Sequence, residues 1–408
     1  MRRSLIFACV CLCCLSCGHK DRSNPLDPSN RVTHGAPPGF TAVALDGRVA
    51  IRWDPLRVEG LLGLNLYRKQ AGSQAFQMVE GSPLPAEAGA AEDSAVTNGV
   101  TYEYRLVPLI RNYGEGTASP TRSATPGPDF AVVSDGCEGL VTQLSADMRA
   151  SVWRAGGFFY PISMATVGDT IWLADLYTGV YCLTKDGALL WKSSDSAFPF
   201  QLAVSGDGLC AVVDAVAATV TILTADGALR SVISEGLVRP SCVAFDEGGN
   251  LWLADRDAAL VGKYSPDGEL LASFHGCAEP RLLDAGVDAV WVGDPSTGEL
   301  VKLDSDGAEL LRLPLSGAMT AIESDRLAGG CWVADEENDV VARVSRDGKV
   351  VFRVGKLGGP SSLFASENGE AWVLGASEPR ITVLSARGEL RSVQAFGQCP
   401  TSIVVLRR

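Results

Sequence analysis

The sequence predicts an all-β protein in which a small sandwich precedes a closed ring of seven four-stranded sheets. The ring follows from a hairpin signal, Asp-Gly between apolar runs, that recurs every 39 to 41 residues. A strand of the form Trp-Leu-Ala-Asp precedes most of these turns by a near-constant distance. Such self-similarity, with four strands per unit, is typical of a β-propeller. The turns end at Gly187, Gly227, Gly268, Gly307, Gly348 and, as Arg-Gly, Gly388.

The first 16 residues have the composition of a secretory signal. A charged start, Met1 to Arg3, is followed by an apolar run that is too short to span a bilayer. The run ends in residues 14–18, Cys-Leu-Ser-Cys-Gly, which resemble the cleavage box of bacterial lipoproteins with Cys17 as the lipidated residue. The alternatives are an ordinary signal peptide, lipidation at Cys14, and an uncleaved membrane anchor.

Residues 17–36 are polar and rich in proline, so we expect a solvated tether. The lipoprotein resemblance implies a protein of the bacterial cell envelope, held to the membrane through its N-terminal lipid. Gly18 follows the cysteine where an aspartate would retain such proteins at the inner membrane. The resemblance therefore implies an outer-membrane or surface location.

Residues 37–127 have the alternating periodicity of a small β-sandwich. About 90 residues without a cysteine resemble a fibronectin type III domain rather than a disulfide-bonded immunoglobulin domain. In this resemblance Trp53 takes the core tryptophan position, Tyr67 is its partner on the next strand, and Tyr102 is the tyrosine corner. A spacer role is expected, with ligand binding as the alternative.

Residues 128–408 contain the repeats, and residues 239–274 show one unit in full. Pro240 opens its first strand, a Gly-rich turn leads to the second strand, and Asp267-Gly268 joins the third to the fourth through the favoured two-residue turn. The units resemble NHL repeats. That resemblance implies a propeller and leaves function open, because such propellers serve both as binding platforms and as enzymes.

The two ends of the repeat region are complementary. Residues 130–153 align with the last three strands of a unit and lack the first, whereas residues 399–405 form a first strand alone. Joined, they make a seventh blade closed by both chain ends. Closure removes the exposed edges of an open array.

Composition excludes several kinds of function. A net charge of −13 argues against nucleic-acid binding, which needs a basic face. The chain has three histidines, and only His275 lies well inside the propeller, which leaves little for histidine-based catalysis or metal binding.

Aspartates recur at the end of the second strand of successive units. Because their period follows the repeat, we expect them to accept hydrogen bonds from nearby turns rather than to catalyse. The sixth copy has Gly375 at this position. The five acids are Asp175, Asp214, Asp255, Asp294 and Asp335.

Two acids break the pattern of the first strands, which line the central channel. Asp284 and Glu323 stand where other copies carry Ala, Phe or Val. They could share a hard cation such as Ca²⁺ or a proton, or they could be two solvated carboxylates. Gluconolactonase-like propellers hold a metal in this channel, but their asparagine ligands have no match here. We therefore expect no cofactor, with channel Ca²⁺ as the alternative.

Residues beside the opening proline of each first strand vary from copy to copy at the channel mouth. A mixture of aromatic rings with arginine suits a polar ligand or a loop of another protein, although neutral drift would also produce variation. The candidate binding residues are Tyr160, Phe200, Arg239, Arg281 and Thr320.

Seven cysteines lie in the propeller, and most resemble small apolar residues within strands. Cys137 follows the second strand of the composite blade, and Cys399 precedes its first strand. Because these strands are antiparallel, both cysteines fall at one edge of one sheet. A disulfide between them is one outcome and free thiols are the other.

The function predicted from the sequence is therefore a non-catalytic, lipid-anchored envelope lipoprotein, expected to be monomeric, whose propeller binds a protein or a glycan. The alternative is a hydrolase or lyase, of the lactonase or streptogramin-lyase kind, with its site at the channel mouth.

Overall fold

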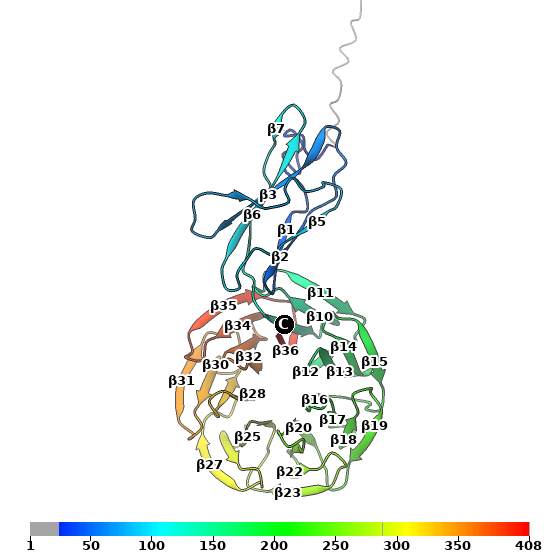
Figure 1. The fold of residues 1–408 in the computed structure, drawn as a ribbon. Helices are drawn as coiled ribbons and strands as arrows, with labels where there is room; N and C mark the ends of the chain where they lie inside the picture. The colour runs from blue at the N-terminus through cyan, green and yellow to red at the C-terminus, as the bar shows by residue number, and fades with distance from the viewer. Residues whose placement is uncertain (1–23, 288, 408) are drawn as a thin grey trace, which may run out of the picture. The chain divides into compact units, whose positions relative to one another are not determined.

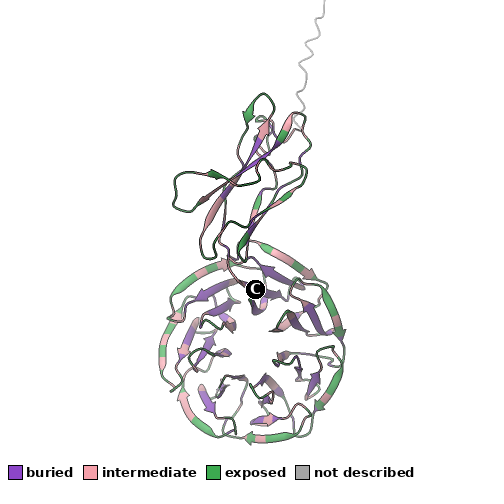
Figure 2. Cartoon of the chain, in the orientation of Figure 1, coloured by how far each residue is buried: buried purple, intermediate pink, exposed green. Residues whose placement is uncertain are grey.

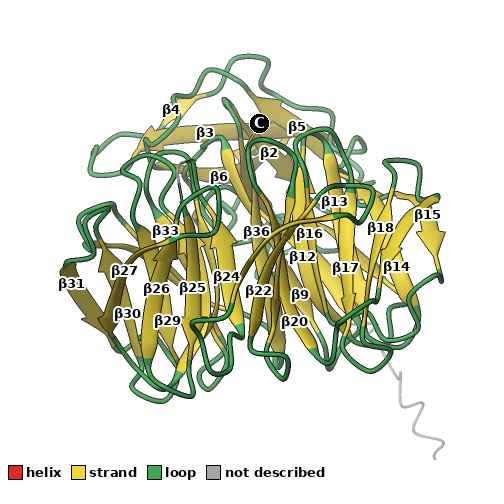
Figure 3. Ribbon diagram, turned by 90° about the horizontal axis from the view of Figure 1, so that it is seen from below, coloured by secondary structure: helices red, strands yellow, loops and turns green. Residues whose placement is uncertain are grey.

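The computed structural model describes residues 24–287 and 289–407. All regular secondary structure in these residues consists of β-strands (Figures 1 and 3). The described residues divide into two compact units, one of residues 24–42 and 48–125, the other of residues 43–47, 126–287 and 289–407. The predicted signal peptide and the lipidation site Cys17 lie outside the described residues. No helix long and apolar enough to cross a membrane occurs in the part of the chain that is described.

Residues 41–124 form two antiparallel sheets, as the sandwich prediction requires. One has the order β1-β2-β5 and the other the order β4-β3-β6-β7, with β8 also paired to β6. The strands are β1 (Thr41–Leu45), β2 (Arg48–Arg52), β3 (Leu61–Gln70), β4 (Gln77–Met78), β5 (Ala90–Asp93), β6 (Tyr102–Ile110), β7 (Gly114–Glu115) and β8 (Arg122–Ala124).

The aromatic residues of the sandwich follow the prediction in part. Trp53 is buried, and the hydroxyl of Tyr102 accepts a hydrogen bond from Thr97 N at 3.1 Å, as a tyrosine corner does. Tyr67 is only half-buried, and its hydroxyl and the side chain of the buried Asn65 both donate to Glu115. Tyr104 is the fully buried ring instead. Membership of the fibronectin type III family stays a prediction.

Residues 24–36 differ from the expected solvated tether. Leu26 and Asn30 are buried, and the Asn30 side chain accepts from Val32 N and Thr33 N while it donates to Asn24 O. These bonds satisfy the backbone of the proline-rich turns locally, so the segment folds as a compact coil without a strand.

The second unit is a propeller of seven four-stranded antiparallel sheets arranged in a ring (Figure 1). From the channel outwards, blade 1 is β36 (Pro400–Arg407), β9 (Asp129–Asp135), β10 (Leu140–Leu144) and β11 (Ser151–Gly156); blade 2 is β12 (Pro161–Val167), β13 (Thr170–Asp175), β14 (Gly179–Thr184) and β15 (Leu189–Ser193); blade 3 is β16 (Gln201–Val204), β17 (Cys210–Asp214), β18 (Thr219–Leu223) and β19 (Leu229–Ile233); blade 4 is β20 (Pro240–Phe245), β21 (Leu251–Asp255), β22 (Leu260–Tyr264) and β23 (Leu270–Phe274).

The remaining blades repeat this plan. Blade 5 is β24 (Leu282–Ala285), β25 (Val290–Asp294), β26 (Glu299–Leu303) and β27 (Glu309–Pro314); blade 6 is β28 (Met319–Ser324), β29 (Cys331–Asp335), β30 (Val340–Val344) and β31 (Val350–Gly355); blade 7 is β32 (Pro360–Ala365), β33 (Ala371–Gly375), β34 (Arg380–Leu384) and β35 (Leu390–Ala395).

Both chain ends close the ring, as predicted. Strand β36 pairs antiparallel with β9, and Ile403 lies opposite Val133 in the register. The all-β fold and the number of blades are therefore confirmed.

The hairpin between the third and fourth strands is longer than the predicted two-residue turn. In blade 4, Gly268 N donates to Ser265 O, Ser265 N donates to Glu269 O, and the register of the two strands shifts at Tyr264. This is a turn over residues 265–268 followed by a bulge, in which Gly268 takes a φ of 91° that favours glycine.

The core lies between the blades, where the second-strand tryptophans are buried. Trp252 of blade 4 packs with Leu283 and Val292 of blade 5, for example. Figure 2 shows buried middle strands and an outer ring of strands that alternate between exposed and half-buried residues. The tryptophans are therefore inter-blade core, as expected.

Candidate functional site

The recurring second-strand aspartates hold the loops that form one rim of the propeller. In blade 4, Asp255 accepts hydrogen bonds from Val238 N at 2.7 Å and Arg239 N at 2.9 Å, just before the first strand, and from Ala258 N at 3.0 Å in its own turn. The structural role predicted for these acids is thus confirmed. Six residues accept bonds from both loops and are called here the clamp aspartates: Asp135, Asp175, Asp214, Asp255, Asp294 and Asp335.

At Asp294 the hydrogen bonds outweigh the effect of burial on the pKa. Burial alone would raise the pKa of Asp294, but the Ser296 hydroxyl and the amides of Glu279, Ala278 and Thr297 donate to its carboxylate, and the net effect lowers its pKa. The loops are therefore tied to an ionised group.

Blade 7 lacks the aspartate and compensates with an acid from the preceding blade. A Cβ on Gly375 would lie 2.6 Å from Leu357 O and 2.9 Å from Gly358 O, so the loop occupies the space of the missing side chain. Asp339 of blade 6 accepts from Leu357 N at 2.9 Å and Gly359 N at 2.8 Å.

These rim loops form an apolar groove of about 430 Å³ over blades 2, 3 and 4, which we call the mouth groove. Phe198 and Phe200 are 38% and 47% exposed there, and Val216 is 76% exposed. The ring of Tyr177 meets that of Phe198 edge-on, with centroids 6.2 Å apart. The groove is lined by Leu176, Tyr177, Phe198, Phe200, Ala215, Val216, Arg239, Pro240, Ser241 and Arg256.

The structure separates the five predicted mouth residues. Phe200 and Arg239 line the mouth groove. Phe200 also lines the channel, together with Arg281 and Thr320, and these last two line a second depression with Glu336 and Glu337 on blades 5 and 6 as well. Tyr160 lines none of these cavities, because its ring covers Gly136, where a Cβ would lie 2.8 Å from Tyr160 Cε2.

The groove also contains residues that sequence reasoning missed. Tyr177, Val216 and Arg256 each follow a second-strand aspartate by one or two positions. First and second strands are antiparallel, so the end of one and the start of the other meet at the same rim. That relation was available in the sequence and could have identified these residues.

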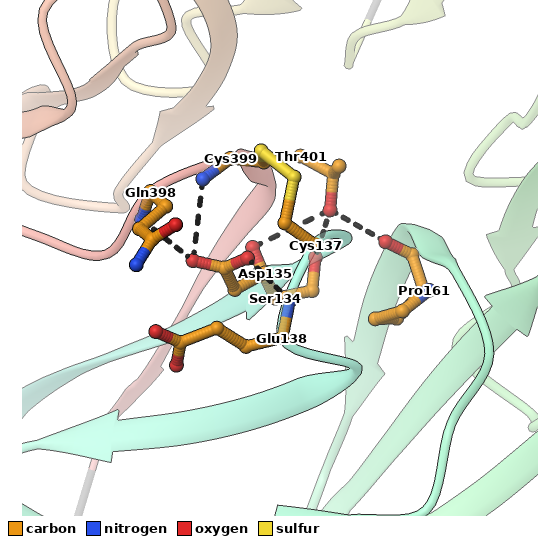
Figure 4. Close-up of a disulfide and its surroundings, with 8 residues drawn as sticks. All are labelled: Ser134, Asp135, Cys137, Glu138, Pro161, Gln398, Cys399 and Thr401. Atoms are coloured by element: carbon orange, nitrogen blue, oxygen red, sulfur yellow. Dashed lines mark hydrogen bonds between the residues drawn. A yellow bond between two sulfur atoms is a disulfide. The ribbon is translucent and has the colours of Figure 1, made fainter.

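Cys137 and Cys399 form a disulfide in blade 1, with Cα atoms 5.4 Å apart (Figure 4). Asp135 lies beside it, and Thr401 Oγ1 donates to Pro161 O of blade 2. Ligand atoms of Asp135, Cys137 and Cys399 lie within 4.8 Å of one another, as in a metal site. The residues fit a metal poorly, because the sulfurs are joined and the carboxylate already accepts from Gln398 N, Cys399 N and Glu138 N.

The other propeller cysteines are unpaired within the described residues. Four of them lie in strands, and Cys277 lies in the loop between β23 and β24. Cys210 and Cys331 are fully buried, and burial raises the pKa of Cys182 to about 11, which keeps that thiol protonated and unreactive. The five are Cys182, Cys210, Cys242, Cys277 and Cys331.

Asp284 and Glu323 both line the channel, from neighbouring inner strands β24 and β28. Ser324 N donates to Asp284 Oδ2 at 2.7 Å, and the Ala365 amide bonds the Glu323 carboxylate in the same way. Each acid therefore braces the inner strand of the next blade.

Hydrogen bonds of the same kind join the inner strands of other neighbouring blades, where a side chain of one strand accepts from a backbone N–H of the next. Elsewhere the acceptors are neutral: Ser402 Oγ accepts from Met164 N at 3.1 Å, and Gln201 Oε1 accepts from Val243 N at 2.9 Å. The position of the acids is thus partly structural.

Ca²⁺ does not fit this pair. The ion takes six to eight oxygen ligands, whereas these two strands offer two carboxylates, each already bonded to an amide. Burial also raises the pKa of both groups, and the charge of Asp284 further raises that of Glu323. A raised pKa favours the protonated acid over a metal ligand.

No histidine lines the mouth groove or the channel among the described residues. His275 is exposed and directly follows the outer strand β23.

A scan of known protein-family models finds none that matches this chain, and a search of the curated proteins finds no match either. Solved structures do match. Virginiamycin B lyase from Staphylococcus aureus is 14% identical, with a TM-score of 0.51 over 58% of this chain and 84% of the lyase. Another structure of that lyase, with quinupristin, carries a histidine-to-alanine substitution and is catalytically inactive.

Two further structures cover more of the chain. A candidate 6-phosphogluconolactonase from Bacteroides fragilis is 15% identical, with a TM-score of 0.57 over 68% of this chain and 98% of that protein. A functionally unknown protein from Desulfotomaculum acetoxidans is 12% identical, with a TM-score of 0.59 over 68% of this chain and 99% of that protein. At these identities the likeness shows the fold alone, and the described residues from 126 to 407 form a β-propeller.

Proposed function

We propose that the propeller is a non-catalytic binding module that holds a segment of another protein in the mouth groove. The observation that carries the proposal is the set of exposed aromatic and aliphatic side chains in one groove, on loops held by the clamp aspartates. Aromatic residues with arginine are the side chains most enriched at the energetic centres of protein interfaces. Variable side chains on rigidly held loops suit recognition.

The composition of the groove favours a protein ligand over a glycan. Sugar hydroxyls need several polar partners, yet none of the described lining residues is Asp, Glu, Asn or Gln. The hydroxyl of Ser241 already donates to Ala254 O and Pro280 O, both at 3.0 Å. The apolar lining suits leucine or aromatic side chains instead.

An enzyme of the lyase or lactonase kind remains the alternative, because the fold is shared with such proteins. Inactivation of virginiamycin B lyase by a histidine-to-alanine substitution points to a need for that side chain in the lyase. The described residues of this groove and channel include no histidine, and the channel acids are bonded to backbone amides. These observations support binding rather than catalysis.

We also propose that the module acts in the cell envelope, anchored through lipid on Cys17. A disulfide between Cys137 and Cys399 suits an exported protein, since cytosolic proteins rarely keep such bonds. Metabolic labelling with palmitate tests the anchor. We expect label in the wild-type protein and none in Cys17→Ser, and labelling of the variant would contradict the assignment.

The binding proposal is tested with a random peptide display library, a glycan array, and assays of lactone and streptogramin turnover. We expect selected peptides to lose at least tenfold in affinity for Phe198→Ser/Phe200→Ser. The matched control is Leu390→Ser, which removes an exposed apolar side chain on the outer strand β35. The proposal fails if peptides bind both variants equally, if only glycans bind, or if turnover depends on groove residues.

A further inference from the structure

We propose that the mouth groove selects an acidic segment: an apolar side chain of the partner enters between Phe198, Phe200 and Val216, and a neighbouring carboxylate pairs with Arg239. This inference rests on the proposed function and specifies the chemistry of its ligand. The occupant is a protein segment in which leucine or an aromatic residue stands beside Asp or Glu.

The charges around the groove carry the argument. Two arginines, Arg239 and Arg256, line it, and no acid does among the described residues. Among the described residues, the guanidinium of Arg239 forms an ion pair with Asp257, whose Oδ2 lies 4.0 Å from Arg239 Nη1. That carboxylate is already bonded to Arg256 Nε at 2.8 Å, and this bond lowers the pKa of Asp257. One acid therefore serves two arginines, and the guanidinium of Arg239 is left without a close partner of its own.

Local charge here opposes the charge of the whole chain. The protein carries a net charge of −13, so an acidic partner is repelled over most of its surface. The exposed guanidinium of Arg239 in the mouth groove gives such a partner a favourable place to dock. Charge of this kind contributes chiefly to specificity and to the rate of association.

The backbone holds Arg239 in position. Its N–H donates to Asp255, and the next residue, Pro240, begins the inner strand β20. A guanidinium can bond a carboxylate through two parallel N–H groups, which fixes the orientation of the ligand. Because the backbone of Arg239 is held, its guanidinium can reach only a limited region of the groove.

The apolar part of the groove is held in the same manner. Asp214 accepts from Phe198 N at 2.9 Å and from Val216 N at 3.1 Å, so one carboxylate supports both walls. Phe200 N donates to Val213 O at 2.9 Å. Because the groove is formed before the ligand arrives, little ordering of loops opposes binding.

The experiment uses the full-length chain and a library of fluorescent octapeptides with a fixed leucine or phenylalanine and three randomised neighbours. We expect Asp and Glu to be enriched at one of these neighbours. Binders should weaken at least tenfold with Arg239→Glu and less with Arg239→Lys, which keeps the charge but loses the fork. Arg391→Glu, an exposed arginine on outer strand β35, is the matched control and should bind as the wild type does.

A second measurement needs no variant protein. Replacing the selected acid of the peptide by its amide should weaken binding by a similar factor, and only the acidic peptide should lose affinity as salt rises. If binders depend on Phe198 and Phe200 but show no acidic preference and tolerate Arg239→Glu, this inference is wrong and the proposed function stands. If binding is insensitive to the aromatic residues as well, both are wrong.

Discussion

At the residue scale, buried carboxylates of the propeller shift their pKa in opposite directions. Hydrogen bonds from loops lower the pKa of Asp294 despite its burial, so its contribution to stability is present above the ordinary aspartate pKa and lost as pH falls through the lowered value. Glu323 is the reverse case. Burial and the charge of Asp284 raise the pKa of Glu323. The protonated side chain therefore contributes to the free energy of unfolding at low pH, and this contribution is lost as pH rises through the raised pKa.

We predict that Glu323→Gln makes the protein more stable at pH 7 and leaves stability nearly unchanged near pH 4. The amide resembles the protonated acid, keeps an acceptor for the Ala365 amide and avoids the cost of ionisation. The difference amounts to about 1.4 kcal/mol for each unit by which the folded pKa exceeds the unfolded one. Urea unfolding across pH 4 to 8 measures it, with the exposed Glu247→Gln as the control. A difference that does not vary with pH would refute the prediction.

A second prediction concerns the clamp aspartate beneath the groove. Asp214→Ala leaves three N–H groups without their acceptor, those of Phe198, Val216 and Ala217. We expect a loss of about 2–3 kcal/mol in the free energy of unfolding and weaker peptide binding, because both groove walls are released. Denaturant titration and peptide affinity are the measurements. Asp306→Ala, at an exposed hairpin, should change neither one.

At the scale of the element, each blade is joined to the next by polar bonds as well as by apolar packing. In blade 5, Lys302 Nζ lies 5.3 Å from the centroid of the Trp291 ring and donates to Arg346 O at 3.0 Å, in the hairpin of blade 6. In blade 6, Arg343 lies over Trp332 and donates to Ala386 O of blade 7. A cation thus covers the buried tryptophan and satisfies a carbonyl of its neighbour.

The third prediction tests the loop that replaces an aspartate in blade 7. Gly375→Ala would force a Cβ against Leu357 O and Gly358 O and disturb the bonds to Asp339. We expect a loss of about 1–3 kcal/mol, measured by chemical denaturation. Gly206→Ala is the control, since a Cβ there meets no atom within 4 Å. Equal stability of the two variants would contradict this account of the loop.

At the scale of the whole molecule, both ends of the propeller meet in blade 1. Pairing of β36 with β9 completes the sheet, and the Cys137–Cys399 disulfide links the same ends across 262 residues of sequence. Asp135 adds hydrogen bonds to Gln398 N and Cys399 N. The ring is thus closed by backbone pairing, a covalent bond and a clamp aspartate.

The fourth prediction concerns this closure. Cys137→Ser/Cys399→Ser should lower the free energy of unfolding by up to about 5 kcal/mol, because the disulfide removes conformational freedom from a long loop of the unfolded chain. Cys242→Ser, at a cysteine without a disulfide, is the control. Wild-type protein in reductant should behave like the double variant. If all of these proteins unfold at the same denaturant concentration, the disulfide does not stabilise the ring.

The sequence by itself determined the propeller, the number of blades and the closure by both ends. It placed Cys137 and Cys399 at one edge of one sheet, whereas the structure decided between a disulfide and free thiols. These features depend on turn chemistry and strand alternation, which are local and repeat with a fixed period. The structural role of the repeated aspartates could be inferred for the same reason. Because the unit is repeated seven times, a residue that differs from the repeat, such as Gly375 in place of aspartate, can be recognised in the sequence.

Only the tertiary structure decided which side chains share the mouth groove. Blades 3 and 4 contribute two loops each and blade 2 contributes one, so Tyr177 and Phe200 line the same groove although they lie on different blades. Tyr160 lies outside the mouth groove, and its ring instead covers Gly136 in blade 1. The amide partner of Asp284 and the substitution of Asp339 for a missing acid likewise depend on distances between blades. A repeat defines the contacts within one unit, whereas contacts between units depend on how each sheet twists and packs against the next.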